Sequence, residues 1–439
     1  MLPTPLAAAF AALGVVAVAL HPTWTTLAIW IAVVVVVVLA DALLAPSPKE
    51  LRVDRDAPRA VRLGNAATVT VTVSNDSRRR VRGVLRDAWP PSAGFGDVAG
   101  PGRTDADRHR LDVPAGERRR LRTVLVPTRR GERVAGGVTV RLVGPLGLGA
   151  RQATLDVPAA VRVLPAFRSR RHLPSRLARL REMDGRASVL VRGQGTEFDS
   201  LREYVLGDDV RSIDWRATAR RGDVHVRTWR PERDRRVLVV VDSGRLSAAR
   251  LGDAPRLDAS IEAVLLLAAL ASHAGDRVDV VAVDAEVRAR ITGVAGARLM
   301  SSLADGLAVV EPALLETDWT TVAQTVGETL SQRALVVLLT AVDPSTMSSG
   351  LLPVVRRLAR DHTVVVAGVE DPAVEELRSD RGDSGSVHDA AAAERTGLER
   401  DAVATRVRQA GADVVQGHPD EIAPRLADAY LALKAAGRL

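Results

Sequence analysis

The sequence of 439 residues contains no cysteine. The chain can therefore form no disulfide bond, hold no metal ion through a thiolate and use no cysteine nucleophile. Lysine is nearly absent as well, because Lys49 and Lys434 are the only lysines among 61 basic residues. An excess of arginine beside abundant alanine and valine is typical of GC-rich coding, so the net charge of +8 is weak evidence for a nucleic-acid ligand.

Common catalytic motifs are also missing. The eight histidines are scattered without an HExxH motif, and no GxxxxGK(S/T) phosphate-binding loop occurs, so the sequence assigns this chain no catalytic residue and no ATPase site. Aromatic residues make up only 3% of the chain, which offers little surface for stacking bases. The length and the 46% hydrophobic content instead predict a protein of two or three folded domains.

Two apolar runs open the chain, LAAAFAALGVVAVAL at 6–20 and TTLAIWIAVVVVVVLADALLA at 25–45. The second has about the length that crosses a ~30 Å hydrocarbon core. Only HPTW separates the two runs, so residues 1–45 are predicted to form a transmembrane helical hairpin. One alternative stays open: the first run would be a signal peptide cleaved after Ala17-Val18-Ala19, although no lysine or arginine precedes it.

Positive charge predicts the orientation of this hairpin. The connecting HPTW is uncharged, whereas Lys49, Arg52, Arg55 and Arg59 follow the second run. Since basic flanks remain on the cytoplasmic side, both the N-terminus and the rest of the chain are expected in the cytoplasm. The sequence thus predicts a two-pass protein of the cell membrane with its bulk at the inner face.

Residues 46–165 alternate between apolar and polar side chains, as half-buried strands do. Strands are expected at 67–75 (ATVTVTVSN), 118–127 (RRRLRTVLVP) and 133–145 (RVAGGVTVRLVGP). Short strands at this spacing, separated by turn residues, predict an all-β domain folded as a small antiparallel sandwich. Its arginines are expected on the solvent-facing sides.

From residue 237 the periodicity changes. VLVVVD at 237–242 is a continuous apolar run, typical of a parallel strand covered on both faces. A strongly apolar helix is expected at 257–275, and strands and helices then alternate to the end of the chain, which predicts an open, doubly wound α/β domain over 237–439. Later strands are expected at 279–285, 334–343, 362–371 and 412–417, helices near 319–332, 349–360, 398–410 and 420–436, and a flexible loop at 379–392.

Residues 166–236 join these two domains. They begin with a polar, arginine-rich helix near 167–186 and continue into GDDVRSIDWRATARRGDVHVRTW at 207–229, where carboxylates, arginines and tryptophans are crowded together. Adjacent carboxylates such as Asp208 and Asp209 could do acid–base chemistry, but in a Gly-Asp-Asp turn they more often cap backbone groups. Four carboxylates would also repel phosphate, so neither an enzyme nor a nucleic-acid-binding protein is the favoured interpretation.

The stretch from 193 to 242 closely resembles the signature of the bacterial domain-of-unknown-function-58 family. A Glu-Phe turn, an Arg and a Tyr, a Gly-Asp-Asp turn, Ile-Asp-Trp, an Ala-Arg pair and a Glu-Arg pair occur in the family's order. Here they are Glu197, Phe198, Arg202, Tyr204, Gly207, Asp208, Asp209, Arg211, Ile213, Asp214, Trp215, Ala217, Arg220, Glu232 and Arg233. The apolar hairpin and the GPLGL sequence at 144–148 fit the same family.

The resemblance implies a membrane-anchored protein with a von Willebrand factor type A-like domain. Genes of such proteins typically lie beside one for a MoxR-type AAA+ ATPase, so it implies that ATPase as a partner and an adaptor role in assembly or maturation of other complexes. It implies no enzymatic activity and no small-molecule substrate. The expected partner-binding residues are those of the signature: Glu197, Arg202, Tyr204, Asp208, Asp209, Arg211, Asp214, Trp215, Arg220 and Glu232.

The charged and the aromatic residues of the segment 193–236 each have an expected set of contacts. Arg211, Asp214, Arg220 and Glu232 are expected to form an ion-pair network, because partly buried charges must be paired. Tyr204, Trp215 and Trp229 are expected to pack along the α/β sheet as apolar anchors, with Trp215 in the core.

The resemblance also raises the question of a metal ion. A type A domain that binds Mg²⁺ uses an Asp-x-Ser-x-Ser turn after its first strand, with a threonine and an aspartate from later loops. Here DSGRLS keeps Asp242 but places Gly244 and Leu246 at the serine positions. A Mg²⁺ site would have to combine Asp242 with Ser243, Thr340 and Asp343, with a hydroxyl from Thr320 or Thr321. The favoured prediction is no cofactor and a hydrogen-bonding role for Asp242.

Overall fold

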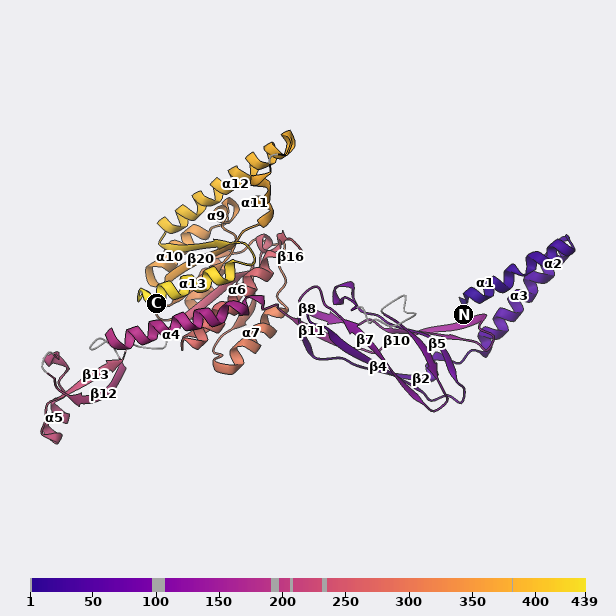
Figure 1. Ribbon diagram of the computed structural model, residues 1–439, viewed down its shortest axis with the longest axis horizontal. Coiled ribbons are helices and arrows are strands. Elements are labelled where there is room, and N and C mark those ends of the chain that lie inside the picture. Colours follow the sequence, from indigo (N-terminus) through magenta and orange to yellow (C-terminus); the bar gives the residue numbers. More distant parts are fainter. Residues whose placement is uncertain (1, 97–106, 191–196, 206–207, 231–234, 381) are drawn as a thin grey trace. The chain divides into compact units, whose positions relative to one another are not determined.

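The computed structural model describes residues 2–96, 107–190, 197–205, 208–230, 235–380 and 382–439. The chain divides into two compact units, residues 1–164 and 165–439 (Figure 1). The first unit holds the apolar N-terminal helices and antiparallel sheets, and the second holds a mostly parallel sheet with its helices.

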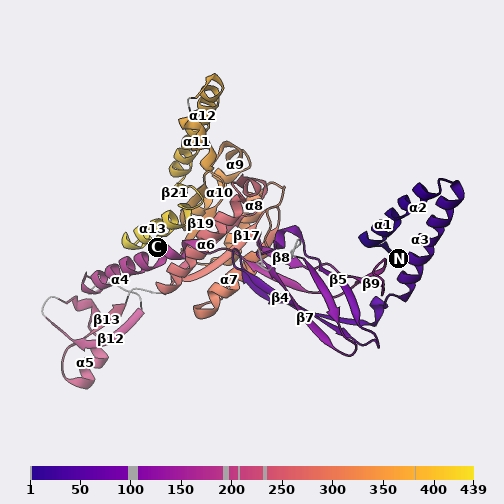
Figure 2. The ribbon, with the colours of Figure 1, turned by 45° about the vertical axis from the view of Figure 1, so that its right-hand side comes forward.

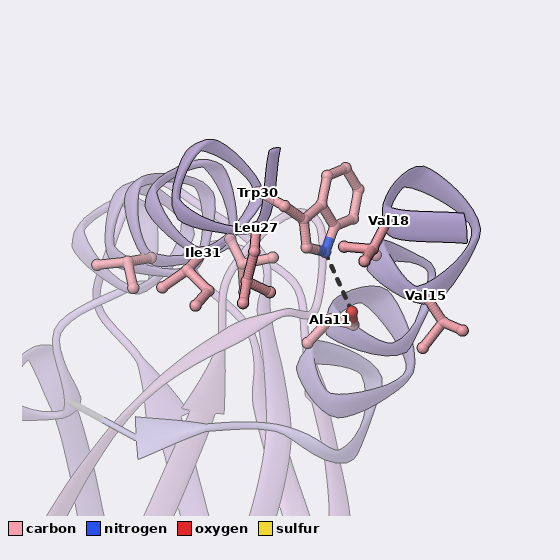
Figure 3. A pocket seen from close by; sticks show the side chains of 9 residues that line it. Ala11, Val15, Val18, Leu27, Trp30 and Ile31 are labelled. Atoms are coloured by element: carbon pink, nitrogen blue, oxygen red, sulfur yellow. Dashed lines mark hydrogen bonds between the residues drawn. The ribbon is translucent and has the colours of Figure 1, made fainter. Parts of the chain in front are cut away.

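Three apolar helices begin the first unit: α1 (Pro5–Ala12), α2 (Gly14–Leu20) and α3 (Trp24–Leu44). In the described part of the chain, the helical stretch from Trp24 to Glu50 alone is long and apolar enough to cross a membrane, and Pro5–Leu20 is a shorter apolar stretch. The two runs pack together, since the Trp30 indole N–H donates to the carbonyl of Ala11 at 3.1 Å (Figure 3). Gly14 permits this approach, because a Cβ there would lie 2.1 Å from the Trp30 ring.

The β region consists of short strands with the predicted alternation. One sheet has the order β1-β10-β9-β5-β6, a second β2-β4-β7 and a third β3-β11-β8. Strand 67–75 is confirmed, whereas the single strand expected at 133–145 is two strands separated by Gly136 and Gly137. The strands are β1 (Leu2–Pro3), β2 (Leu51–Asp56), β3 (Ala60–Arg62), β4 (Ala67–Asn75), β5 (Val81–Asp87), β6 (Arg108–Val113), β7 (Arg118–Leu125), β8 (Gly131–Val134), β9 (Val138–Val143), β10 (Gly149–Leu155) and β11 (Ala160–Leu164).

The first two of these sheets share one hydrophobic core. Val71 and Val73 of β4 pack with Leu85 of β5 and with Val140 and Leu142 of β9, and all five are fully buried. Every second residue of β4 contributes to a buried face, as the period of a strand requires.

Not every arginine of this region faces solvent, which corrects the prediction. The side chains of Arg55 and Asp87 are both fully buried and form an ion pair at 2.7 Å. The Trp89 indole N–H donates to the second oxygen of Asp87 at 3.1 Å, and Arg55 also donates to the carbonyls of Val157 and Gly136. A folded protein tolerates buried charges when they are paired and hydrogen-bonded in this way.

Asp41, near the end of helix α3, is only 1% exposed. One carboxylate oxygen accepts the backbone N–H of Leu146 at 2.8 Å, and the other accepts those of Leu148 and Gly149 at 2.7 and 2.8 Å. Gly144 lies so close that a Cβ would be 2.2 Å from the Asp41 carbonyl oxygen. The turn at 144–149 therefore binds the end of α3 directly.

The N-terminal residues reach the same turn. Leu2 and Pro3 pair with Ala150 and Gly149 as strand β1 against β10. The Thr4 hydroxyl donates to the carbonyl of Gly147 at 2.6 Å. Both apolar runs are thus attached to β10 and the turn before it.

A six-stranded sheet forms the centre of the second unit, in the order β18-β17-β14-β19-β20-β21. All neighbours are parallel except β17 and β18. Its elements are α4 (Leu173–Leu190), β14 (Arg236–Asp242), α6 (Arg256–His273), β17 (Arg277–Val283), β18 (Val287–Ile291), α7 (Leu299–Ala308), α8 (Trp319–Thr329), β19 (Leu335–Leu339), α9 (Pro344–Ser348), α10 (Leu351–Asp361), β20 (Thr363–Val369), α11 (Pro372–Ser379), α12 (Ser384–Gln409), β21 (Ala412–Gly417) and α13 (Ile422–Ala435).

Helices cover both faces of this sheet, and this explains the continuous apolar run at its central strand. Val239 and Val241 of β14 pack in a core with α6, α7 and α13, while Leu238 and Val240 pack in a second core with α8, α10 and α12. Both faces of β14 are therefore buried, so no polar residue interrupts its apolar run. Figure 2 shows helices α6, α7, α8 and α10 around strands β17 and β19 of this sheet.

The α/β prediction was incomplete or wrong in several places, and helices α7, α9 and α11 were not predicted. Strand β18, VRARI, was not predicted, because it is an edge strand with mostly exposed side chains. The loop expected at 379–392 is largely helix: Asp383 and Ser386 form a reciprocal capping box that begins α12. Glycine and serine near this start suggested a loop, but the cap turns them into a helix N-terminus.

Candidate functional site

The part of the family signature that precedes β14 forms a small hairpin unit. Strand β12 (Glu197–Glu203) pairs antiparallel with β13 (His225–Arg230), and between them lie the 3₁₀ turn η4 (Val210–Ser212) and helix α5 (Trp215–Arg221). Buried Val226 of β13 forms an additional bridge with Ile213. The side chains of Glu197 and Trp229, and the whole of Glu232, lie outside the described residues.

The adjacent aspartates of the Gly-Asp-Asp turn cap backbone groups, as predicted. Asp208 accepts the N–H of Val205 at 3.0 Å and pairs with Arg202 at 2.5 Å. Asp209 is the N-cap of η4 and accepts the N–H of Arg211 at 2.9 Å. These bonds fix the local backbone of the turn.

Asp214 has a structural role at the start of α5. It accepts the N–H groups of Arg216 and Ala217 at 3.0 Å and pairs with Arg227 at 2.7 Å. The bond from Ala217 and then that from Arg227 lower the pKa of Asp214. This corrects the predicted network, because among the described residues the partner of Asp214 is Arg227 and neither Arg211 nor Arg220 pairs with a carboxylate.

Trp215 is the clearest departure from the prediction. Its side chain is 69% exposed instead of buried, and exposed Val205, Val210 and Val224 belong to the same hairpin unit, whereas Tyr204 is half-buried. Helix α5 has only seven residues and so offers little surface to cover an indole. A large exposed aromatic among arginines without carboxylate partners is typical of a surface that binds another protein.

A second cluster lies at the carboxyl edge of the parallel sheet. Asp242, at the end of β14, is 4% exposed and accepts bonds from the N–H of Gly244 at 2.8 Å and the hydroxyls of Thr317 and Thr340 at 2.5 and 2.6 Å. Burial raises the pKa of Asp242, and the three donors act in the opposite direction. This is the hydrogen-bonding role that the sequence favoured.

The other predicted metal ligands point elsewhere. The Ser243 hydroxyl donates to Asp284 at 3.1 Å, and Asp343 caps helix α9 through the N–H groups of Ser345 and Thr346. Of the four predicted ligands, the structure brings together Asp242 and Thr340. Thr317 was missed, since nothing in its neighbours distinguishes it from Thr320 and Thr321, which both bond to Asp318 instead.

A cavity of about 20 Å³ lies beside Asp242, with room for about one water molecule. Leu246 lines it, where a metal-binding turn would offer a hydroxyl. No group of three histidine, aspartate or glutamate side chains within the described ranges is placed to hold a metal ion. The donor set therefore does not fit Mg²⁺, which requires an octahedral cage of oxygen ligands.

Fold and site together define a protein with an apolar N-terminal helix, antiparallel β-sheets, a mostly parallel α/β sheet with a polar edge, and a separate hairpin that exposes a tryptophan. Residues 200–418 match the family described as "Protein of unknown function DUF58". The chain carries a DUF58 family domain, as the signature predicted.

Solved structures resemble parts of the chain at low similarity. A CARDB domain from Pyrococcus furiosus, crystallised in complex with di-metal ions, is 15% identical with a TM-score of 0.18 over 28% of this chain and 91% of that one. A β-glucosidase from Listeria innocua in complex with glucose is 16% identical with a TM-score of 0.15 over 24% of this chain and 16% of that one. A search of curated proteins found no match.

Proposed function

We propose that this protein is a membrane-anchored adaptor that presents its DUF58 domain to a partner protein in the cytoplasm. The partner is a MoxR-type AAA+ ATPase, and the process served is assembly or maturation of other complexes. In this proposal the β region is a sandwich and the α/β domain is a doubly wound, von Willebrand factor type A-like domain. The proposal is supported by one apolar helix of spanning length and by helices on both faces of the sheet.

The exposed face of the hairpin carries the proposal. Trp215 is 69% exposed, and Arg211, Arg216 and Arg220 of the same hairpin unit are also exposed. Tryptophan and arginine contribute most strongly to binding when a partner covers them. Asp208, Asp209 and Asp214 are engaged in caps and local pairs, whereas Asp223 is exposed. The hairpin therefore offers an apolar anchor with several exposed arginines, which suits an apolar pocket rimmed by acidic residues.

Capture of the purified ATPase by the full chain in detergent tests this assignment. Trp215→Ala is expected to weaken binding roughly 30-fold or more, the effect of losing a hot-spot side chain. Arg220→Ala should weaken it less and make it less sensitive to salt. Leu314→Ala is the matched control, because Leu314 is 81% exposed and lies outside the hairpin. Failure of the native chain to capture the ATPase, or equal capture by a folded Trp215→Ala variant, would refute the proposal.

A two-pass topology with a retained first run belongs to the same proposal. It is supported by β1 and Thr4, whose bonds to the 147–150 region would be lost on cleavage after Ala19. Because the chain has no cysteine, a single introduced cysteine is a unique label. His21→Cys should react with an impermeant maleimide from outside intact cells, and Ser384→Cys only after lysis. The reverse pattern, or an intact mass that lacks the first run, would contradict it.

A further inference from the structure

The sheets of the first unit have one end that meets helix α3. The turn at 144–149 follows β9 at this end and binds Asp41 of α3. Because β5 pairs antiparallel with β9, β5 begins at the same end, directly after the turn at 76–80. The 3₁₀ turn η1 (Pro48–Glu50) leads from α3 into β2 and lies near β9 and β10. Figure 1 shows α3 running up to this end of the sheets, so segments remote in sequence meet where the apolar helix ends.

Buried Asn75, the last residue of β4, joins two turns at this end. Its side-chain amide donates to the carbonyl of Arg79 at 2.8 Å and to that of Pro114 at 3.0 Å. The turns at 76–80 and 114–117 therefore lie side by side. Because β2 begins opposite Asn75, both turns lie at the end of the sheets to which α3 is attached.

The segments at this end form a strongly basic surface. We call residues 49–52, 76–80 and 114–119 the basic rim. They include seven basic and three acidic residues, and all ten of these side chains are exposed. None of the residues in these three segments is aromatic, so bases have no side chain to stack on. The basic rim thus suits phosphate groups better than it suits the bases of a nucleic acid.

Part of this positive charge is not neutralised within the protein. Among the described residues, Arg78, Arg79 and Arg118 form no ion pair with a carboxylate. Arg52 and Asp76 pair at 3.2 Å, but both side chains are more than half exposed. Such a pair is weak, because water and salt screen it. The basic rim therefore presents arginine side chains that are available to an external anion.

Exposed leucines accompany the basic rim. Leu146 in the turn at 144–149 is 65% exposed, and Leu43 and Leu44 at the end of α3 are 59% and 53% exposed. When α3 spans a bilayer, hydrocarbon covers leucines at its end, and basic residues just beyond them lie at the level of the head groups. Apolar side chains bordered by arginines are typical of a protein surface at a membrane interface.

We propose that the basic rim binds the phosphate groups of anionic phospholipids in the leaflet at the Leu44 end of α3. The proposal rests on the membrane anchorage of the proposed function, but not on its ATPase partner. The guanidinium group of arginine suits this ligand, because its parallel N–H donors match two oxygens of one phosphate. The negative potential of an anionic leaflet also attracts basic residues that lie just outside a membrane helix. The basic rim thereby holds the first sheets against the membrane surface.

Reconstitution of the full chain in nanodiscs of phosphatidylcholine and phosphatidylglycerol tests the proposal without any partner. After mild extraction into detergent, the lipids that remain with the chain are counted by mass spectrometry. Phosphatidylglycerol should be enriched roughly fivefold or more over its share of the bilayer, the effect of at least one basic residue near an anionic surface. A wash at high salt should remove the enrichment, because salt screens the attraction.

Arg78→Gln combined with Arg79→Gln should abolish most of this enrichment, and Arg118→Gln in the neighbouring turn should lower it independently. Asn75 bonds to the backbone of Arg79, so a change of side chain leaves that bond intact. The matched control is Arg59→Gln combined with Arg129→Gln, because these exposed arginines lie beyond the opposite ends of β2 and β7. The control variant should retain as much phosphatidylglycerol as the native chain.

Equal retention of the two lipids by the native chain overturns the proposal, and so does an enrichment that persists in the folded double variant of the 76–80 turn. Binding of a labelled RNA oligonucleotide by the native chain, lost in that variant and without lipid enrichment, would assign the basic rim to nucleic acid and overturn it as well. A chain that does not stay in the nanodiscs would instead refute the membrane anchorage, and with it the proposed function.

Discussion

Asp87→Ala is expected to lower the free energy of unfolding of the first unit by about 3–5 kcal/mol, because it leaves the guanidinium of Arg55 buried without its counter-ion. Both side chains of this pair are fully buried, and Trp89 loses a hydrogen-bond acceptor at the same time. Chemical unfolding of the full chain in detergent measures the effect. The Trp89 signal is the difference in fluorescence between each chain and the same chain carrying Trp89→Phe.

Asp112→Ala provides the comparison for this prediction. Asp112 pairs with Arg80 at 2.6 Å in the same sheet, but the two side chains are 28% and 54% exposed. An exposed pair contributes little to the free energy of unfolding, because water and salt screen it. Equal losses for the two variants would mean that burial does not determine the strength of the Arg55–Asp87 pair.

The second large effect is expected at the junction of helix and sheet. Asp41→Ala removes the acceptor for three backbone N–H groups, those of Leu146, Leu148 and Gly149. Losing charge-assisted bonds and leaving buried donors unsatisfied should cost about 2–4 kcal/mol. Hydrogen exchange of these three amides measures it directly, since their protection should fall by a factor of about 30 or more if opening becomes that much easier.

Asp54→Ala serves as the control for this measurement, because Asp54 is an exposed aspartate of β2. It should leave exchange in the 144–149 turn unchanged. Unaltered protection in a folded Asp41→Ala variant would show that the turn holds its conformation without the carboxylate.

How well each element could be predicted from the sequence depends on the force that shapes it. Strand β4 was predicted at its observed bounds of 67–75, because burial imposes a period of two on its side chains. Strand β21 was also predicted at its observed bounds of 412–417. The buried pair of Arg55 and Asp87 could not be predicted, since its members are 32 residues apart and each alone resembles a solvated charge.

The candidate site was predicted in its composition but not in its contacts. Capping by Asp208 and Asp209 follows from local sequence and is confirmed. The pairing of Asp214 with Arg227 depends on the register between β12 and β13, which the sequence does not specify. Exposure of Trp215 depends on what covers it in three dimensions, and a hydrophobic residue in a pattern carries no information about that cover.

The turn at 144–149 has a mechanical consequence. Strand β1, Thr4 and Asp41 fasten both apolar runs to the same turn and strand, and only three residues separate α3 from the 3₁₀ turn that precedes β2. No flexible linker separates them at this point, so the helices and the first sheet are expected to move together. In the proposed membrane-anchored protein, a pull on the sheet would therefore tilt the helices in the bilayer, because no slack chain lies between them.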